Sequence, residues 1–275
     1  MIEINNLSFY YKKGKPVFEQ VSFEMASGIY GLLGENGVGK STLLRIIAGL
    51  RFPDSGQCKI DGKDTFRRDP ETLSKVFLLP EEFESPTVKI DRFIKDNAKF
   101  YPHFSREQFE NNMRDFEMET DRKFSELSYG QKKKVLISYG MSLNTPYVLL
   151  DEPTNGLDIP SKAQFRKVIA SAYDEDRCII ISTHQVRDLE SLIDPIIILD
   201  RNQVLLNNSV EEITRKLVFK HTQNKPENTY YTESNLAGYS YVGPNLTGEE
   251  TTLNIEMLFN AAVSNRTTFK DLFNV

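Results

Sequence analysis

The segment GENGVGKS, residues 34–41, constrains the fold of this chain more than any other stretch. It follows the short apolar run GIYGLL and precedes KSTLLRIIAGL, whose apolar spacing predicts a helix ending near Gly49. A loop of the form G-x-x-x-x-G-K-S between a strand and a helix is typical of phosphate binding. Its glycines let the backbone wrap around phosphates, and the helix N-terminus favours an anion. The segment therefore predicts an α/β domain organised around this strand, loop and helix.

The loop predicts a site for ATP with Mg²⁺. Lys40 would neutralise the β- and γ-phosphates, and the Ser41 hydroxyl would ligate the metal ion. The alternative is a glycine turn that happens to precede Lys-Ser, which the flanking strand and helix disfavour. The residues predicted to bind the nucleotide here are Gly34, Glu35, Asn36, Gly37, Val38, Gly39, Lys40, Ser41 and Thr42.

The rest of the chain shows the alternation of strands and helices that indicates a largely parallel sheet. Short apolar runs predict the strands, and amphipathic segments between them predict the helices. The predicted strands are residues 2–9, 17–25, 28–34, 75–80, 147–151, 177–183 and 195–200. The predicted helices are residues 40–50, 161–174, 185–193 and 209–217.

Two segments depart from this alternation. Residues 86–126 are polar, helical in pattern and rich in Phe, and they predict an insertion within a helical subdomain of about residues 86–140. The C-terminal part is turn-rich, with a helix predicted over residues 254–263. We expect residues 1–217 to form one domain and residues 218–275 a small appendage.

Composition and charge exclude several classes of protein. With 275 residues, 39% of them hydrophobic and 27% charged, the chain is typical of a globular protein. Its net charge of -5 argues against nucleic acid as the main partner, because phosphate binding usually needs a basic face. Cys58 and Cys178 are too few for a disulfide framework, which indicates a reducing compartment. Cys178, in the run CIII, is predicted to lie in the core.

No apolar run approaches the roughly 20 residues that a membrane-spanning helix needs. The longest runs, CIII and PIIIL, are far shorter, and the N-terminal MIEINNLSFYY lacks the basic and apolar blocks of a signal peptide. We expect a cytoplasmic protein that reaches a membrane only through a partner.

The segment LSYGQKKK, residues 127–134, has two separate features. Ser128 and Gln131 have the spacing of a capping box, which marks the start of a helix. The apolar positions that follow, such as Val135 and Tyr139, predict a helix buried on one face. Capping does not explain Gly130, since glycine costs a helix about 1 kcal/mol relative to alanine. A backbone that another group must approach closely would explain it.

The segment YVLLDEP, residues 147–153, ends an apolar strand with two acids. Carboxylates at the carboxyl end of a parallel strand lie where such sheets bind ligands. Asp151 is predicted to hold Mg²⁺, and Glu152 to polarise an attacking water; two solvated carboxylates are the alternative. His184, after the next strand, is predicted to contact the γ-phosphate and the water, although a lone histidine is more often structural.

Together these motifs resemble the nucleotide-binding subunits of ABC transporters. GENGVGKST, the signature LSYGQKKK, VLLDEP, NGLD and STH occur in the order and spacing of that family, over about residues 1–215. The resemblance implies an ATPase with an α/β P-loop NTPase fold. Its largely parallel core sheet, antiparallel β subdomain and helical subdomain would be joined here by a small C-terminal α+β appendage. The resemblance also implies a head-to-tail dimer, with ATP between one subunit's phosphate loop and the other's signature.

Several residue roles follow from the resemblance alone. Ser128 and Gly130, with Gln131 beside them, would contact the γ-phosphate of ATP held by the opposite subunit. The helix start behind them would supply partial positive charge, which explains the glycine. Tyr11, or alternatively Tyr10, would stack on adenine.

Two positions depart from the family pattern. The loop that usually carries a Mg²⁺-binding glutamine offers Glu81 here, and a carboxylate oxygen suits Mg²⁺ at least as well as an amide. Tyr129 replaces the commoner glycine of the signature.

The resemblance favours the energising subunit of a membrane transporter. ATP hydrolysis would drive transport through separate integral membrane permease subunits, which would dock on the helical insertion and hold the chain at the inner face of the membrane. Glu81 and the short tail favour export. Two copies would complete two equivalent ATP sites, so a homodimer suffices, with a heterodimer as the alternative. The cargo cannot be read from a chain without the membrane subunits.

The sequence also offers two other functions. A soluble ABC ATPase without a transport role, for example in metallocluster assembly, stays open. The single phosphate loop argues against the two-cassette translation type, and the roughly 90 residues between phosphate loop and signature argue against the coiled-coil repair type. A nucleotide-binding switch without hydrolysis is disfavoured by Glu152 and His184.

Overall fold

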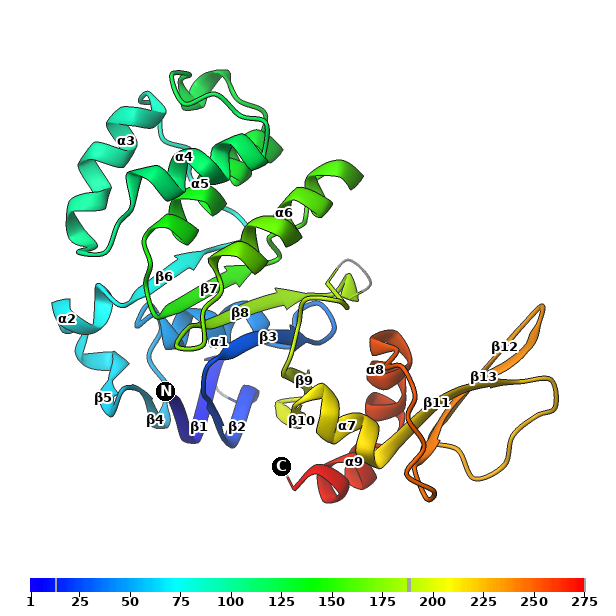
Figure 1. Cartoon of the computed structure of the whole chain (residues 1–275). Coiled ribbons are helices and arrows are strands. Elements are labelled where there is room, and N and C mark those ends of the chain that lie inside the picture. The colour runs from blue at the N-terminus through cyan, green and yellow to red at the C-terminus, as the bar shows by residue number, and fades with distance from the viewer. Residues whose placement is uncertain (13, 187–188, 275) are drawn as a thin grey trace.

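The computed structural model describes residues 1–12, 14–186 and 189–274 (Figure 1). Within the described residues the central sheet has six strands, parallel to their neighbours except for the edge pair β9 and β10. Their spatial order is β10 (Gln203–Asn208), β9 (Ile196–Asp200), β3 (Gly28–Leu33), β8 (Cys178–Thr183), β7 (Tyr147–Asp151) and β6 (Val76–Leu79). The predicted largely parallel sheet is confirmed.

A second, antiparallel sheet lies beside the central one and confirms the antiparallel subdomain (Figure 1). The same buried cluster holds Phe18 from this sheet, Leu44 from helix α1 and Ile180 from the central sheet. Helix α1 is therefore packed on both sides, which fixes the loop before it. The elements are β1 (Ile2–Lys12), β2 (Lys15–Met25), α1 (Lys40–Ile47), β4 (Ser55–Ile60) and β5 (Lys63–Asp64), followed by η1 (Thr65–Arg67) and α2 (Pro70–Leu73).

The insertion over residues 86–126 is mostly helical, as predicted (Figure 1). The Ser105 hydroxyl accepts the N–H of Gln108 at 3.2 Å and starts helix α4. Phe109, Phe116 and Phe124 are fully buried, so the Phe-rich composition builds the core of this subdomain. Its elements are α3 (Ile90–Asn97), η2 (Ala98–Phe100), α4 (Arg106–Asp115) and η3 (Phe124–Glu126).

Helix α5 (Tyr129–Ser142) begins at the predicted capping box but differs from the prediction further on. Every residue from Val135 to Ser142 is buried, so this half of the helix is enclosed on all sides and not on one face. The reason is that α4, α6 (Ile159–Ala172) and β6 all pack against it. A Cβ at Gly140 would lie 2.1 Å from the Phe77 ring, which shows how closely α5 approaches the sheet.

The helix predicted over residues 185–193 is not regular where the structure describes it. Residues 189–192 form turns, and residues 187 and 188 lie outside the described part of the chain. The N–H groups of Leu192 and Ile193 both donate to the carbonyl of Leu189, at 2.8 and 3.2 Å. These two hydrogen bonds form a turn directly before β9.

The C-terminal segment combines strands and helices and packs against the central sheet. Leu258 of α8 and Phe269 of α9 belong to the same buried cluster as Ile196 of β9. Arg266 also forms an ion pair with Asp200, and Figure 1 shows the β12–β13 hairpin extending away from the body. The elements are α7 (Val210–Lys216), β11 (Leu217–Thr222), β12 (Tyr231–Asn235), β13 (Gly238–Pro244), α8 (Ile255–Ser264) and α9 (Arg266–Phe273).

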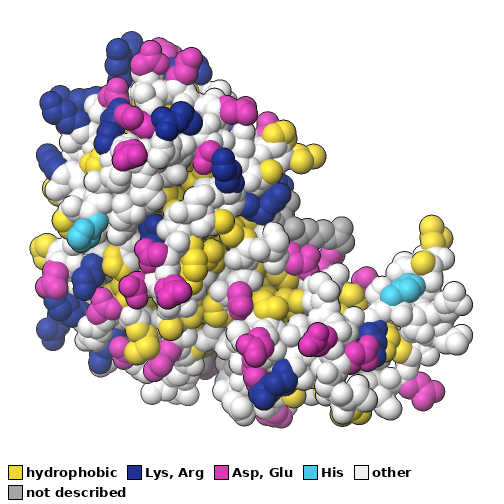
Figure 2. All heavy atoms as spheres, in the orientation of Figure 1, with side chains coloured by type: hydrophobic (Ala, Val, Ile, Leu, Met, Phe, Trp, Pro, Cys, Tyr) yellow, Lys and Arg dark blue, Asp and Glu magenta, His cyan; other side chains and the backbone are white. Residues whose placement is uncertain are grey.

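Charges of both signs are interspersed over the face drawn in Figure 2. Cys58 and Cys178 are both buried free thiols, and burial raises the pKa of each to about 12. Among the helices that the structure describes, none is long and apolar enough to cross a membrane.

Candidate active site

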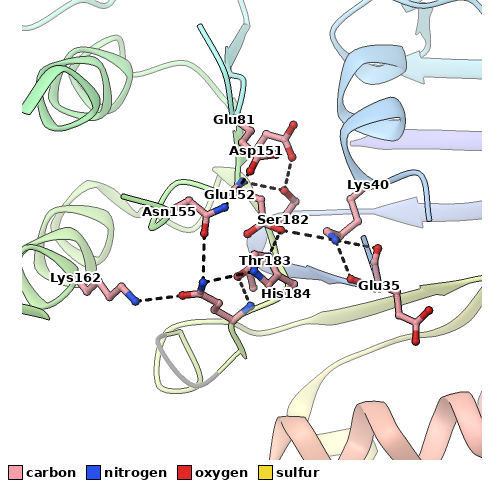
Figure 3. Close-up of polar contacts among 12 residues, drawn as sticks. Glu35, Lys40, Glu81, Asp151, Glu152, Asn155, Lys162, Ser182, Thr183 and His184 are labelled. Carbon is pink, nitrogen blue, oxygen red and sulfur yellow. Dashed lines mark hydrogen bonds and ion pairs between the residues drawn. The ribbon is translucent and has the colours of Figure 1, made fainter. Parts of the chain in front are cut away.

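The carboxyl ends of β3, β7 and β8 meet at one edge of the central sheet, where the predicted catalytic side chains lie together (Figure 3). The glycine-rich loop follows β3, Asp151 ends β7, and His184 comes directly after β8. Because β8 lies between β3 and β7, the segment carrying His184 is flanked by the loop and by the acids. Parallel pairing thus assembles the site from three segments far apart in the sequence.

The backbone of the loop before α1 adopts conformations that require glycine. Gly37 and Gly39 have φ values of 80° and 117°, in the region that other residues rarely adopt. A Cβ at Gly39 would also lie 2.7 Å from Val17 and 2.8 Å from Phe18. No side chain caps the helix that starts at Lys40, so its first N–H groups are left for an anion.

Lys40 is folded back over this loop. Its Nζ donates to the carbonyl oxygens of Gly34 at 2.8 Å and Glu35 at 3.2 Å, and it lies 3.7 Å from Glu152 Oε1. The side chain is 6% exposed, and burial lowers the pKa of its ammonium, an effect that the Glu152 carboxylate opposes. The loop thus carries a desolvated positive charge directly after its glycines.

Glu152 is almost completely buried, with 4% of its surface exposed. One carboxylate oxygen, Oε1, lies 2.9 Å from His184 Nδ1, whereas the other, Oε2, is buried without a hydrogen-bond partner. Its φ of 46° is left-handed, and its N–H donates to the Ser182 carbonyl at 3.1 Å. Most buried carboxylate oxygens have a hydrogen-bond partner, so Oε2 is unusual in this respect.

Asp151 is held by a serine that the sequence analysis did not single out. The Ser182 hydroxyl donates to Asp151 Oδ1 at 2.6 Å and accepts the N–H of Glu152 at 3.1 Å. Asp151 is 2% exposed and Ser182 is fully buried. Ser182 therefore joins the ends of β7 and β8 beneath the site.

A cavity of about 340 Å³ opens over these groups. It brings together most of the predicted residues, including Glu81 from the loop after β6. The predicted loop residues Gly34, Glu35 and Val38 do not line it, and neither does Asp151. Its lining is Tyr11, Val17, Asn36, Gly37, Gly39, Lys40, Ser41, Thr42, Glu81, Glu152 and His184.

Tyr11 is the tyrosine that borders this cavity. Its hydroxyl lies 2.9 Å from Thr42 Oγ1, and its ring is 54% exposed. The Arg51 guanidinium lies 5.8 Å from the centre of the same ring. Tyr10, the alternative from the sequence, is not part of the lining, and its N–H donates to Asp54.

The signature residues lie elsewhere. Ser128 Oγ accepts the N–H of Gln131 at 3.2 Å, and Gln131 Oε1 accepts the N–H of Ser128 at 3.0 Å, which completes the predicted capping box. A Cβ at Gly130 would lie 2.8 Å from the carbonyl oxygen of Gly156. None of these three signature residues lines the cavity over the phosphate loop. One chain therefore does not bring its signature to its own phosphate loop.

The sequence analysis also missed two residues that connect the site. Asn155 donates from Nδ2 to Glu81 Oε1 at 3.0 Å. Lys133, fully buried, donates to the carbonyl oxygens of Glu152 at 2.9 Å and Asn155 at 3.0 Å. Asn155 belongs to NGLD, a motif noticed but not assigned, whereas nothing in the run of three lysines distinguishes Lys133.

Comparison with known proteins decides the family. The family model for ABC transporters matches residues 18–155. The chain belongs to the ABC transporter ATP-binding family. An uncharacterised ABC transporter ATP-binding protein of Methanocaldococcus jannaschii is 31% identical over 228 residues, which cover 79% of this chain and 81% of that protein.

Solved structures of ABC proteins have the same fold. An ATP-binding subunit of an ABC transporter gives a TM-score of 0.70 at 25% identity, covering 78% of this chain and 92% of that one. A bacterial ABC transporter cassette with a dimeric structure gives a TM-score of 0.66 at 22% identity, covering 76% of this chain and 99% of that one. The expected ABC fold, with its antiparallel and helical subdomains, is confirmed.

Membership of this family establishes the activity. The chain is an ABC ATPase, the ATP-binding subunit of an ABC transporter, and it hydrolyses ATP. This settles the choice between a transporter subunit and an ABC ATPase without a transport role. The roles of the individual side chains remain predictions, and the contacts described above indicate which atoms each role would use.

Proposed function

We propose that two copies of this ATP-binding subunit pair head to tail and hydrolyse two ATP molecules to drive export through separate membrane subunits. The observation that carries this proposal is the place of the signature. Helix α5 starts at Ser128 with a full capping box, yet this helix start does not line the cavity over the phosphate loop of its own chain. A second copy would supply the missing half of each site, and the dimeric cassette of similar fold supports this pairing.

Within each site we assign the chemistry to the groups that border the cavity. Lys40 and the uncapped start of α1 would neutralise the phosphates. Glu152 would polarise the attacking water, since its side chain borders the cavity. His184, bonded to Oε1, would hold the carboxylate in place. Tyr11 would stack on adenine at the exposed side of the cavity.

The oxygen donors of the site fit Mg²⁺. Ser41 and Glu81 line the cavity, and Asp151 lies beneath it with Oδ1 bonded to Ser182. Among the described residues no group of three His, Cys, Asp or Glu could hold a metal ion by itself. Proteins usually hold Mg²⁺ with one or two carboxylates together with phosphate oxygens and water. When bound, the ion would screen the charge of the phosphates.

The direction of transport and the membrane partner rest on the sequence. Glu81 in place of glutamine and the short tail favour export, and the helical insertion is the proposed docking site for the membrane subunits. We place the chain at the cytoplasmic side of the membrane, where ATP is available. We also propose residues 1–217 as the ATPase domain and residues 218–275 as an appendage, since none of the latter lines the cavity.

Complementation between two defective copies tests the head-to-tail dimer. Lys40→Ala damages the phosphate-loop half of a site, and Ser128→Arg places bulk and charge at the signature half. Each variant alone builds two defective sites. A mixture should recover part of the ATPase activity, because mixed dimers contain one site with both defects and one with neither.

The controls separate the outcomes. Exchange of subunits is confirmed first with differently tagged copies. A mixture as inactive as its parents would then contradict independent sites in a head-to-tail dimer. Full activity of Ser128→Arg alone would show that the signature is only a helix cap and would overturn the proposal.

A further inference from the structure

Lys133 is a buried cation that donates to the backbone beside the active site. The side chain is fully buried, and its Nζ donates to the carbonyl oxygens of Glu152 and Asn155 at 2.9 and 3.0 Å. It also lies 5.3 Å from the centre of the Tyr129 ring. Burial lowers the pKa of this ammonium, and the carboxylates of Glu81, Glu152 and Asp151 oppose that effect. Burying a cation is costly unless it is hydrogen-bonded, so Lys133 depends on its contacts with these two carbonyl oxygens.

The backbone that Lys133 contacts is unusual. Glu152 has a left-handed φ of 46°, a conformation that costs a residue with a side chain roughly 1–2 kcal/mol. Both of its peptide groups are held: the N–H donates to Ser182, and the carbonyl accepts from Lys133 and from the N–H of Asn155 at 3.2 Å. This conformation sets the direction of the Glu152 side chain between Lys40 and His184.

Of the three consecutive lysines, Lys133 faces this backbone. Lys134 contacts other elements: its Nζ lies 3.5 Å from the Phe116 carbonyl and 3.2 Å from Gln164 Oε1. Both side chains belong to helix α5, which begins directly after Ser128. Lys133 therefore connects the helix that carries the signature with the loop that carries the proposed base.

We propose that Lys133 is a positioning residue that holds Glu152 in its catalytic backbone conformation and ties it to the signature helix. The inference rests on the proposed role of Glu152 as the group that polarises water. It adds a physical link between the two sites of the dimer. A shift of α5, when Ser128 meets the nucleotide of the opposite subunit, would move the carbonyl of Glu152 in its own subunit.

The test compares Lys133→Met with Lys134→Met in the full chain. Methionine keeps most of the length of the side chain and removes the charge and the donors. Lys133→Met should lower kcat about tenfold or more and leave KM and the affinity for ATP within about threefold. Lys134→Met, which removes a cation from the same helix away from the site, should keep kcat within about twofold. Because partly unfolded protein would also lower the apparent kcat without changing KM, kcat is calculated per ATP-binding site, with the sites counted by titration.

A double-mutant cycle shows whether Lys133 acts through Glu152. In single-turnover assays, Lys133→Met should add little to the defect of Glu152→Gln, since the same function is already lost. If Lys133→Met does not fold, Lys133→Gln, which keeps an N–H donor, enters the same assays and should show a smaller loss of kcat. Wild-type kcat in the folded variant, or equal losses with and without Glu152, would overturn the proposal. Full turnover by Glu152→Gln would instead refute the assignment of the base.

Discussion

Glu152 Oε1 lies 2.9 Å from Nδ1 of His184, while the second oxygen of the same carboxylate is buried without a partner. The two residues follow neighbouring parallel strands, β7 and β8, so their distance is set by the pairing of the sheet. The imidazole occupies one oxygen, and the other faces no donor of the described residues. The proposed role of Glu152 as the group that polarises water rests on its carboxylate, which borders the cavity.

Glu152→Gln should therefore bind ATP and fail to hydrolyse it. The amide keeps the shape of the side chain but loses the carboxylate, and turnover should fall by about 100-fold or more. An ATP-bound dimer should then persist in gel filtration, since the nucleotide is not consumed. Turnover at the wild-type rate would assign the base elsewhere, with His184 the first candidate.

Lys40→Ala should weaken ATP binding by about tenfold or more, because a charge-assisted contact to the phosphates is lost. Titration calorimetry in the Glu152→Gln background measures the affinity without hydrolysis. Lys99→Ala, at an exposed lysine of the helical subdomain, is the control and should bind as wild type. Equal affinities for the two lysine variants would refute the phosphate-loop assignment.

Gly140→Ala should destabilise the fold, because its Cβ would overlap the Phe77 ring at 2.1 Å. The free energy of unfolding should fall by about 1–3 kcal/mol, the usual cost of overpacking, even though alanine is the better helix former. Urea denaturation measures this change. The loss should be smaller when Phe77→Leu is present, because the shorter side chain makes room. Additive losses would show that the two residues do not meet.

Arg266→Ala should loosen the C-terminal appendage. Asp200 is 4% exposed and pairs with Arg266, so the variant leaves a buried carboxylate without its cation. We expect a loss of about 1–3 kcal/mol in the free energy of unfolding, since Arg266 itself is partly exposed. Asp200→Asn should recover part of this loss by removing the unpaired charge. An unchanged urea midpoint for Arg266→Ala would contradict the docking of α9 on the central sheet.

Asp61 should make stability depend on pH. Burial acts to raise the pKa of its carboxyl, but hydrogen bonds from Tyr147, the N-terminal ammonium and Lys75 outweigh burial and hold the pKa well below its usual range. The folded pKa lies below the unfolded value of about 3.9, so the contribution is present above about pH 4 and is lost as pH falls through the folded value.

Asp61→Asn should accordingly lower the urea midpoint at neutral pH and matter progressively less below about pH 4. The effect should be about 1 kcal/mol or less, because the Asp61 side chain is 38% exposed and its pairs are screened. Lys59→Ala, on the neighbouring strand, is the control and should show no such pH dependence. A difference that stays constant down to about pH 3 would contradict the ionised state as its cause.

Features with strict local requirements could be predicted from the sequence. The glycines of the loop before α1 are needed for its backbone, and the spacing of Ser128 and Gln131 is needed for a capping box; both are in the structure. The order of strands and helices was also predictable, because hydrophobic period reflects which side of an element is buried. There were exceptions: turns interrupt the described part of the helix predicted over residues 185–193, and strands β4 and β10 were not predicted.

What the sequence determined by itself is thus the family, most of the elements and the residue types of the site, because each motif and each element depends on neighbours within a few positions. The tertiary structure alone decided which side chains meet. It enclosed α5 on all sides, turned Lys133 toward the carbonyls of Glu152 and Asn155, and docked α9 on the central sheet. These contacts join residues far apart in the chain, and a run of three lysines does not encode which one will be buried.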